Sequence, residues 1–460
     1  MIFTACLLNG RAVFLIEGGF LLEQTHSEKL SLINGRIHTA SGIASSITLE
    51  YGRIASIGDT AGNLDGKIID LRGRTVLPGF CDTGLDFLSW AENQERLNLS
   101  SVHSLKEFGD SLSTYSHANQ KPLRGWYIAN NLPDDIIISR DDIDDLISEV
   151  PCAVIDSKNS HAVLNTQAMN EFNMPQDNVE LDEFTQHLPE FSGDDILYLV
   201  KTYGPKINAL GITEIWSDFY GGAKRIWDIL FSEAYESFTF RMRMNFGFAE
   251  VNSMNEFLST GLRTGDGLPF CRLGGILING QLDQKDQKAM ITSAHLSGCQ
   301  IISDNNKSCI NSLEHVIKRV RKNSRHIIRD VTANITDRMK YLGLGGIAIH
   351  GRDDAFIHEA FRNGLVISAG SDEVLVPPMK NISTMLSHGL SVAEALSIYT
   401  WGASWNGGVD SRRGELAVGN DADIVVLEQD PFSVRPEETA GIDVSMTFTA
   451  GKVVYDSGAV

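Results

Sequence analysis

Carboxylates follow several of the apolar runs in this sequence, and a carboxyl group can donate or accept a proton during a reaction. Asp372 ends the run LVISAGSD, Asp330 ends SRHIIRD, and Asp86 lies shortly after TVLPGF. Ser303, after the run CQII, and His326, inside SRHIIRD, add polar groups that can bind a substrate. These side chains can act together only if the elements that carry them bring them to one place.

Between residues 78 and 407 the chain alternates apolar, β-branched runs with amphipathic segments that are typical of helices. The candidate strands are residues 124–132, 152–158, 212–218, 241–248, 271–280, 299–306, 325–331, 345–351 and 365–372. Apolar runs that end in polar residues, each followed by a helix, indicate a parallel sheet with crossover helices. About eight such units predict an α/β fold, a (β/α)8 TIM-like barrel with its function at the carboxyl ends of the strands.

Both ends of the chain have a different pattern, of short strands separated by turns. Asn34-Gly35, Tyr51-Gly52 and Ala450-Gly451 lie between alternating apolar runs, which is a hairpin signal. We therefore expect residues 29–77 and 408–460 to form one small β-sandwich domain beside the barrel of residues 78–407. Residues 1–28 are apolar but are interrupted by Arg11 and Glu17, so we interpret them as an N-terminal extension rather than a secretory signal.

Composition restricts the partners and the location of the protein. The 39 Lys+Arg and 59 Asp+Glu residues give a net charge of −20, which argues against a nucleic-acid partner. The six cysteines have no C-x-x-C spacing and predict reduced thiols in a cytoplasmic protein. No apolar stretch approaches the roughly 18 residues that a membrane span needs, so we expect no membrane partner. A small-molecule substrate is the partner that remains.

Several segments resemble one known superfamily. They are residues 66–87, 159–169, 210–218, 324–330, 365–378, 391–405 and 414–431. Together they resemble the amidohydrolase superfamily, and in particular the amidohydrolase-3 branch that contains N-substituted formamide deformylases. The resemblance covers roughly residues 29–456 and implies a (β/α)8 barrel that performs metal-assisted hydrolysis. The superfamily's metal ligands are a His-x-His pair, a bridging Lys, two single His residues and a final Asp.

In this sequence most of those ligand positions hold other residues. The His-x-His positions are Gly84 and Asp86, the Lys position is Gly275 or Leu277, and the single His positions are Ser303 and Asp330. Only the final Asp is kept, as Asp372. One ligand cannot hold zinc, which usually needs three or four protein ligands, so we predict no zinc site and no cofactor.

The resemblance implies that Asp86, Asp330 and Asp372 converge in one pocket, and we predict these three as the catalytic residues. Carboxylates at short range cannot all stay ionised, so one should have a raised pKa and act as acid beside an ionised base. The predicted substrate-binding residues are His161, Asn165, Ser303, Trp90, Trp216 and His326. The alternative is that the carboxylates bind a hard cation such as Mg²⁺, Ca²⁺ or Mn²⁺.

Three functions follow from this pattern. The first is metal-independent acid–base chemistry on a small molecule: isomerisation, cyclisation, dehydration or the opening of an activated ring. The second is a catalytically inactive pseudoenzyme that serves as a binding or partner subunit. The third is an amide or C–N bond hydrolase whose metal site has moved, with His350 or His326 among the ligands. By analogy with the superfamily, the chain is expected to form a homodimer.

Overall fold

The computed structural model describes residues 4–8, 11–16, 19–20, 29–58, 66–158, 160–220, 237–278, 282–304, 307–320, 325–329, 346–350, 354–372 and 374–458. The chain divides into two compact units. The barrel unit contains Met1–Phe87 and Lys201–Val460, and the inserted unit contains Leu88–Val200. Helices α1 (Phe87–Glu95) and α6 (Gly193–Asn208) span the two boundaries.

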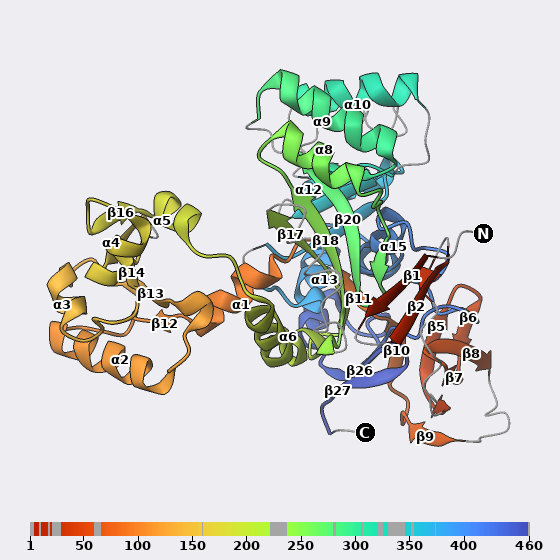
Figure 1. The fold of residues 1–460 in the computed structure, drawn as a ribbon. Coiled ribbons are helices and arrows are strands. Elements are labelled where there is room, and N and C mark those ends of the chain that lie inside the picture. The colour runs from red at the N-terminus through yellow and green to blue at the C-terminus, as the bar shows by residue number, and fades with distance from the viewer. Residues whose placement is uncertain are drawn as a thin grey trace. The chain divides into compact units, whose positions relative to one another are not determined.

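Eight parallel strands form the main sheet of the barrel unit (Figure 1). In sheet order they are β11 (Phe80–Asp82), β17 (Ile212–Tyr220), β18 (Arg241–Gly247), β20 (Cys271–Ile278), β21 (Gln300–Ser303), β22 (Ile327–Ile328), β23 (Gly346–His350) and β24 (Ile367–Gly370). A short strand, β19 (Gly267–Leu268), pairs antiparallel with β20. The first and last strands meet where the backbone N–H of Thr83 donates to the carbonyl of Ala369 at 3.3 Å.

Helices follow these strands as the sequence predicts. They are α8 (Val251–Ser259), α9 (Gln284–Ser297), α10 (Lys307–Arg319), α12 (Asp354–Arg362), α13 (Pro378–Ser387), α14 (Val392–Tyr399) and α15 (Trp401–Asn406). Local sequence sets their ends: Asp283 caps α9 by accepting from the N–H of Asp286, and Gly298 ends it at φ +82°. Every residue of β18 is buried, which is why its sequence reads as one continuous run.

Strands from both ends of the chain share a six-stranded sheet, in the order β27, β26, β25, β10, β5, β6. At its centre β10 (Thr75–Pro78) pairs antiparallel with β25 (Ile424–Leu427) and parallel with β5 (Arg36–Thr39). The other strands are β6 (Gly42–Ala44), β26 (Val444–Thr449) and β27 (Lys452–Asp456). A short 3-10 helix, Pro436–Gly441, lies between β25 and β26 in the sequence.

A four-stranded sheet contains β8 (Arg53–Gly58), β7 (Ser46–Glu50), β4 (Leu30–Ile33) and β9 (Lys67–Asp70). Buried residues of this sheet, including Leu32 and Ile47, form one apolar cluster with Ile424 and Phe448 of the six-stranded sheet. A separate β-sandwich domain with the expected boundaries stays a prediction. Within residues 1–28, β1 (Thr4–Leu8), β2 (Arg11–Ile16) and β3 (Gly19–Phe20) form a small antiparallel sheet.

The inserted unit has its own five-stranded sheet, of β12 (Leu97–Asn98), β13 (Tyr127–Leu132), β14 (Cys152–Asp156), β15 (His161–Leu164) and β16 (Asn178–Glu180). Its helices are α2 (Leu105–Ala118), α3 (Arg140–Asp144), α4 (Thr166–Phe172), α5 (Leu181–His187) and the 3-10 turn Leu123–Gly125. Figure 1 shows these elements together in orange and yellow.

Two runs that we expected in the barrel, residues 124–132 and 152–158, belong to this second sheet. The reason is that β13 is buried on both faces, as a barrel strand would be. Tyr127 and Ala129 pack in one apolar cluster, and Trp126 and Ile128 pack in another. A strand covered on both sides has the same continuous apolar pattern in either kind of sheet, so the pattern alone does not distinguish them.

The side chain of Asn165 holds three segments of the inserted unit together, which leads to a prediction about stability. Its Oδ1 accepts from the N–H groups of Cys152 and Ala168, both at 2.9 Å, and its Nδ2 donates to the carbonyls of Ile147 (2.7 Å) and Val150 (2.9 Å). Asn165→Ala leaves these buried groups unpaired and should lower the free energy of unfolding of this unit by about 2 kcal/mol or more.

The measurement is hydrogen exchange of β14 and α4 in the full chain, which reports the opening free energy of this unit alone. His161→Ala, four residues away on a half-exposed side chain, is the control and should change that free energy by no more than about 0.5 kcal/mol. Equal exchange rates in wild type and Asn165→Ala would contradict the structural role of this amide.

Candidate functional site

An ion pair stands at the carboxyl ends of three barrel strands. Arg329, directly after β22, donates from Nη1 and Nη2 to both oxygens of Asp218 on β17, the Nη2–Oδ1 distance being 2.8 Å. Asn245 on β18 donates to the same Oδ1 at 3.0 Å. Burial alone would lower the pKa of Arg329, but the charge of Asp218 outweighs it and raises the pKa. The guanidinium therefore keeps its charge at the mouth of the barrel.

Tyr220 ends β17 beside this pair. Its ring lies against Gly247, where an added Cβ would stand 2.2 Å from the tyrosine Cε1, so only glycine leaves room for the ring. Tyr220 is 61% exposed as a residue, but partial desolvation of its hydroxyl raises the pKa of Tyr220, and the negative charges of Asp218, Asp304 and Asp86 raise it further. The phenol stays protonated at neutral pH and can donate a hydrogen bond. Asp86 and Asp304 are within electrostatic range of this side chain.

Asp82 is a buried carboxylate that joins the first barrel strand to the last. Its Oδ1 accepts from the N–H groups of Gly84 and Leu85, both at 3.1 Å, and of Ser371 at 2.8 Å. Its Oδ2 accepts from Ser371 at 2.9 Å. Burial raises the pKa of Asp82, while these hydrogen bonds oppose the rise. The carboxylate thereby fixes the two segments that carry Asp86 and Asp372.

The structure places two of the three predicted catalytic residues. Asp86 is partly buried between β11 and α1, and it lies in electrostatic range of Tyr220. Asp372 is exposed and follows Ser371, whose N–H binds Asp82. Asp330 lies outside the described residues. The convergence of the three carboxylates in one pocket stays a prediction.

Two predicted substrate-binding residues lie in the barrel interior or at its edge. Ser303 is buried at the end of β21, and its hydroxyl donates to the carbonyl of Asp304 at 3.0 Å. Trp216 on β17 is 1% exposed, and its Nε1 donates to Glu214 at 3.0 Å. The guanidinium of Arg243 stacks over the Trp216 ring, with 4.7 Å from Cζ to the ring centroid. These contacts make Trp216 part of the barrel core.

His326 is also buried, and both of its ring nitrogens have partners. Its Nδ1 accepts from the N–H of Ile301 at 3.0 Å, so its Nε2 donates to Nδ1 of His295 at 2.9 Å. The Nε2 of His295 in turn donates to the carbonyl of Val320 at 2.7 Å. This chain of hydrogen bonds is complete only when both rings are neutral. It leaves no ring nitrogen of His326 for a substrate.

The other three predicted substrate-binding residues belong to the inserted unit. Trp90 is buried in α1. His161 is half-exposed at the start of β15, with its Nδ1 3.1 Å from the hydroxyl of Ser160. Asn165 caps α4. The four hydrogen bonds of its side-chain amide, described above, all join it to backbone groups of this unit. A role of these residues in substrate binding stays a prediction.

The residues described at the mouth do not fit the metal that the superfamily uses. The oxygens of Asp82 are occupied by four backbone N–H contacts. Arg329 binds both oxygens of Asp218, so that carboxylate is also engaged at the strand ends. Among the described residues, no group of three or more His, Cys, Asp or Glu side chains is placed to hold a metal ion. Asp330 and the side chain of His350 lie outside those residues.

Sequence reasoning missed the central ion pair of this site. Asp218 and Arg329 both stand in segments that resemble the superfamily, residues 210–218 and 324–330, but neither was predicted as a site residue. The usable signal was that both are polar residues near the carboxyl end of a predicted parallel strand. Polar residues at that position face the functional end of a barrel, whatever their type.

Comparison with known families supports the amidohydrolase superfamily. Residues 345–455 match the model of an amidohydrolase family. A curated relative, "Putative amidohydrolase YtcJ" of Bacillus subtilis strain 168, is 29% identical over 110 residues. That alignment covers 20% of this chain and 21% of the relative, so it spans only about a fifth of either protein.

Solved structures extend the likeness to the fold of the whole chain. An uncharacterized metal-dependent hydrolase from Pyrococcus furiosus has a TM-score of 0.73 at 16% identity and covers 88% of this chain and 100% of its own. Its counterpart from Pyrococcus horikoshii has a TM-score of 0.74 at 15% identity, over 89% and 99%. A triazine hydrolase from Arthrobacter aurescens has a TM-score of 0.57 at 12% identity, over 94% and 95%. These neighbours show a TIM-like amidohydrolase fold.

No helix in the described part of the chain is long and apolar enough to cross a membrane.

The buried histidine pair predicts how stability depends on pH. Burial, with a smaller effect of His295, lowers the pKa of His326 to about 3, whereas an unfolded His has its ordinary value of 6.5. Between these values the unfolded chain binds a proton that the folded chain does not. Stability is therefore complete above about pH 6.5 and is lost as the pH falls toward 3.

His326→Gln removes this proton linkage. Between pH 6 and pH 4 the slope of the variant's free energy of unfolding against pH should be smaller than that of the wild type by about 1.4 kcal/mol per pH unit. Urea unfolding of the full chain at a series of pH values measures the slope. His388→Gln, on an exposed side chain, is the matched control and should keep the wild-type slope. If the free energy of unfolding changes with pH equally in wild type and in His326→Gln, the inference that His326 is neutral in the folded protein is wrong.

Proposed function

We propose that this protein is an enzyme that uses the amidohydrolase fold for metal-independent acid–base chemistry on a small molecule. The observation that carries the proposal is the Arg329–Asp218 ion pair with Asn245 and Tyr220 beside it. It stands at the carboxyl ends of the strands, where barrel enzymes perform their chemistry. Amidohydrolase relatives support a hydrolase-like activity.

Each group at this mouth has a defined chemical capacity. Tyr220 stays protonated, and because its pKa is raised it is suited to donate a hydrogen bond to the substrate rather than a proton. Asp86 and Asp372 supply carboxylates that can accept a proton, on the loops after the first and last strands. Arg329 keeps a permanent charge that can stabilise an oxygen as it becomes negative. Asn245 fixes Asp218, and Asp218 fixes the guanidinium.

These groups suit some reactions better than others. Hydrolysis of an unactivated amide needs several kcal/mol of stabilisation that a metal ion and its bound hydroxide would supply. Reactions that need only proton transfers in a shaped site do not have this requirement. Isomerisation, cyclisation, dehydration and the opening of an activated ring are therefore the classes that we propose.

A second candidate is an amide or C–N bond hydrolase with a relocated metal site. It is favoured by the two Pyrococcus structures, each described as a metal-dependent hydrolase, and by the zinc complexes among the other neighbours. Metal content distinguishes this candidate from the first. If neither the acid–base reaction nor the hydrolysis is found, the protein is a pseudoenzyme that only binds its ligand.

We predict that the full chain, purified from medium supplemented with zinc, holds well under one equivalent of zinc. The physical reason is that the resemblance puts Gly84 and Ser303 at positions that would need imidazoles, and that Arg329 engages both oxygens of Asp218 at the strand ends. Elemental analysis of the protein after gel filtration measures the ratio. One equivalent of zinc that resists dialysis would overturn this proposal and favour the relocated metal site.

Asp372→Asn tests the acid–base role directly. Asn keeps the shape of the side chain but cannot titrate, so turnover should fall by about 10²-fold or more while the fold is kept. Tyr220→Phe should also slow turnover, because it removes the proposed donor without removing the ring. The substrate is sought among small molecules that remain bound through purification, identified by mass spectrometry and then assayed.

Asp443→Asn, an exposed carboxylate between β25 and β26, is the matched control and should react at the wild-type rate. If Asp372→Asn also runs at that rate with the wild-type pH dependence, the acid–base mechanism at this residue is wrong. Circular dichroism and gel filtration of each variant exclude a folding defect as the cause of a loss.

A further inference from the structure

Arginines gather at the amino ends of the barrel strands, the end opposite to the mouth. Arg241 and Arg243 lie on β18, and Arg272 lies at the start of β20. Arg412 and Arg413 come from the segment before β25. Arg272 is the Cα partner of Arg243 in the parallel pairing of β18 and β20, so both side chains leave the sheet on the same face.

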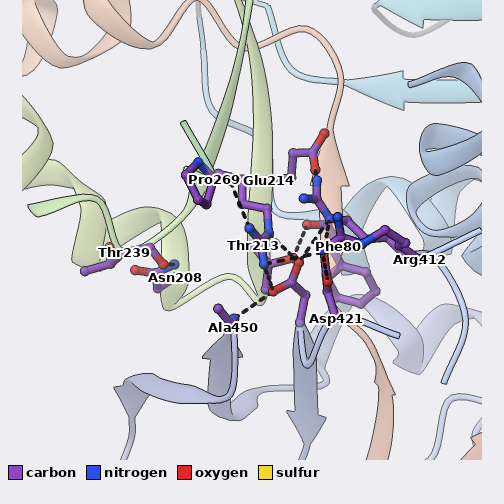
Figure 2. Close-up of polar contacts among 12 residues, drawn as sticks. Phe80, Asn208, Thr213, Glu214, Thr239, Pro269, Arg412, Asp421 and Ala450 are labelled. Atoms are coloured by element: carbon purple, nitrogen blue, oxygen red, sulfur yellow. Dashed lines mark hydrogen bonds and ion pairs between the residues drawn. The ribbon is translucent and has the colours of Figure 1, made fainter. Parts of the chain in front are cut away.

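The carboxylates among these arginines already have partners, as Figure 2 shows for most of them. The ion pairs are Arg241–Asp423 at 2.7 Å, Arg413–Asp421 at 2.9 Å, Arg412–Asp421 at 2.7 Å and Arg413–Glu214 at 2.5 Å. Asp423 also accepts from the N–H of Ala450 at 2.7 Å, and Glu214 accepts from Trp216 at 3.0 Å. Little acceptor capacity is left at this end for a further guanidinium.

The guanidinium of Arg272 has no partner in the described part of the chain. Within the described residues it makes no hydrogen bond or ion pair, and its Nε is buried with no acceptor. Burial lowers the pKa of Arg272 to about 10, and the positive charges of Arg413, Arg241 and Arg412 contribute to the decrease. Glu214 opposes it without contacting the side chain. A partly buried cation surrounded by like charges is destabilising unless an anion joins it.

A second donor in the same group is unsatisfied. The Nε of Arg412 is also buried without an acceptor, although its Nη2 binds Asp421 at 2.7 Å. Arg412 is within electrostatic range of Arg272. The guanidinium fork presents parallel N–H donors that match the oxygens of a phosphate or carboxylate.

We propose that Arg272, flanked by Arg412, binds a small oxyanion, a phosphate or a carboxylate, at the amino end of the barrel. The anion would pair the partly buried guanidinium of Arg272 and would offset the repulsion from its neighbours. This site is separate from the chemistry at the mouth, and its test does not depend on any activity.

The test is thermal unfolding of the full chain in increasing inorganic phosphate, with sodium chloride at equal ionic strength as the reference. Bound anion stabilises the folded state by mass action, so phosphate should raise the unfolding temperature along a saturating curve that chloride does not reproduce. Acetate in place of phosphate then shows whether a carboxylate binds as well. Equilibrium dialysis with labelled phosphate should give about one site per chain, since the proposed site is built on the single side chain of Arg272.

Arg272→Gln should abolish the phosphate effect. Without phosphate it should unfold at a higher temperature than wild type, because it removes a charge that Arg413, Arg241 and Arg412 repel. Arg263→Gln, an exposed arginine close by in the sequence, is the control for the loss of one positive charge and should keep the phosphate effect. Arg272→Lys keeps the charge but not the fork, and should weaken phosphate binding at least several-fold.

Equal shifts with phosphate and chloride would overturn the proposal, as would a phosphate effect that persists in Arg272→Gln. If Arg272→Gln fails to fold, the dialysis of wild type and Arg272→Lys decides, because unchanged binding by the lysine variant also contradicts a site built on the guanidinium fork.

Discussion

Closure of the parallel sheet is the constraint on which the rest of this structure depends, and one buried carboxylate does much to secure it. Asp82 follows the first barrel strand and accepts N–H bonds from its own loop and from Ser371 after the last strand. The adjacent Gly370 must be a glycine, since an added Cβ would stand 2.3 Å from an oxygen of Asp82. Because those oxygens accept hydrogen bonds from backbone N–H groups, Asp82 joins the first and last strands at the mouth and is not available as a metal ligand.

Charge is distributed unevenly along the chain, and this explains how an acidic protein carries a basic barrel end. Residues 88–200 contain 20 of the Asp+Glu residues against 6 of the Lys+Arg residues, so most of the net charge of −20 belongs to the inserted unit. Ion pairs between arginines and carboxylates join β17, β18 and the segment before β25 inside the barrel unit. Buried pairs of this kind add specificity to the arrangement of elements more than net stability.

The sequence predicted the barrel strands from residue 212 onward, because buried parallel strands read as apolar runs with polar ends. It did not separate the inserted unit, because β13 and β14 are also covered on both faces. The sequence could not show which site residues pair with each other, for another reason. Asp218 and Arg329 are 111 residues apart, and only the folded sheet shows that they pair. Likewise, the sequence does not show that the side chains of Asn165 and His326 bind backbone groups; their role in substrate binding stays a prediction.

A guanidinium and a metal ion can both stabilise negative charge, but they do not support the same chemistry. A divalent ion lowers the pKa of its bound water and so makes a nucleophile, whereas an arginine has no open coordination position and stays protonated. In the function proposed above, Arg329, fixed by Asp218 and Asn245, would stabilise an oxyanion, and the nearby carboxylates would transfer protons beside the hydrogen-bond donor Tyr220. In that mechanism the nucleophile would be part of the substrate or a water activated by a carboxylate. A molecule with an internal nucleophile, an acidic C–H bond or an activated ring would suit it, whereas an unactivated amide would not.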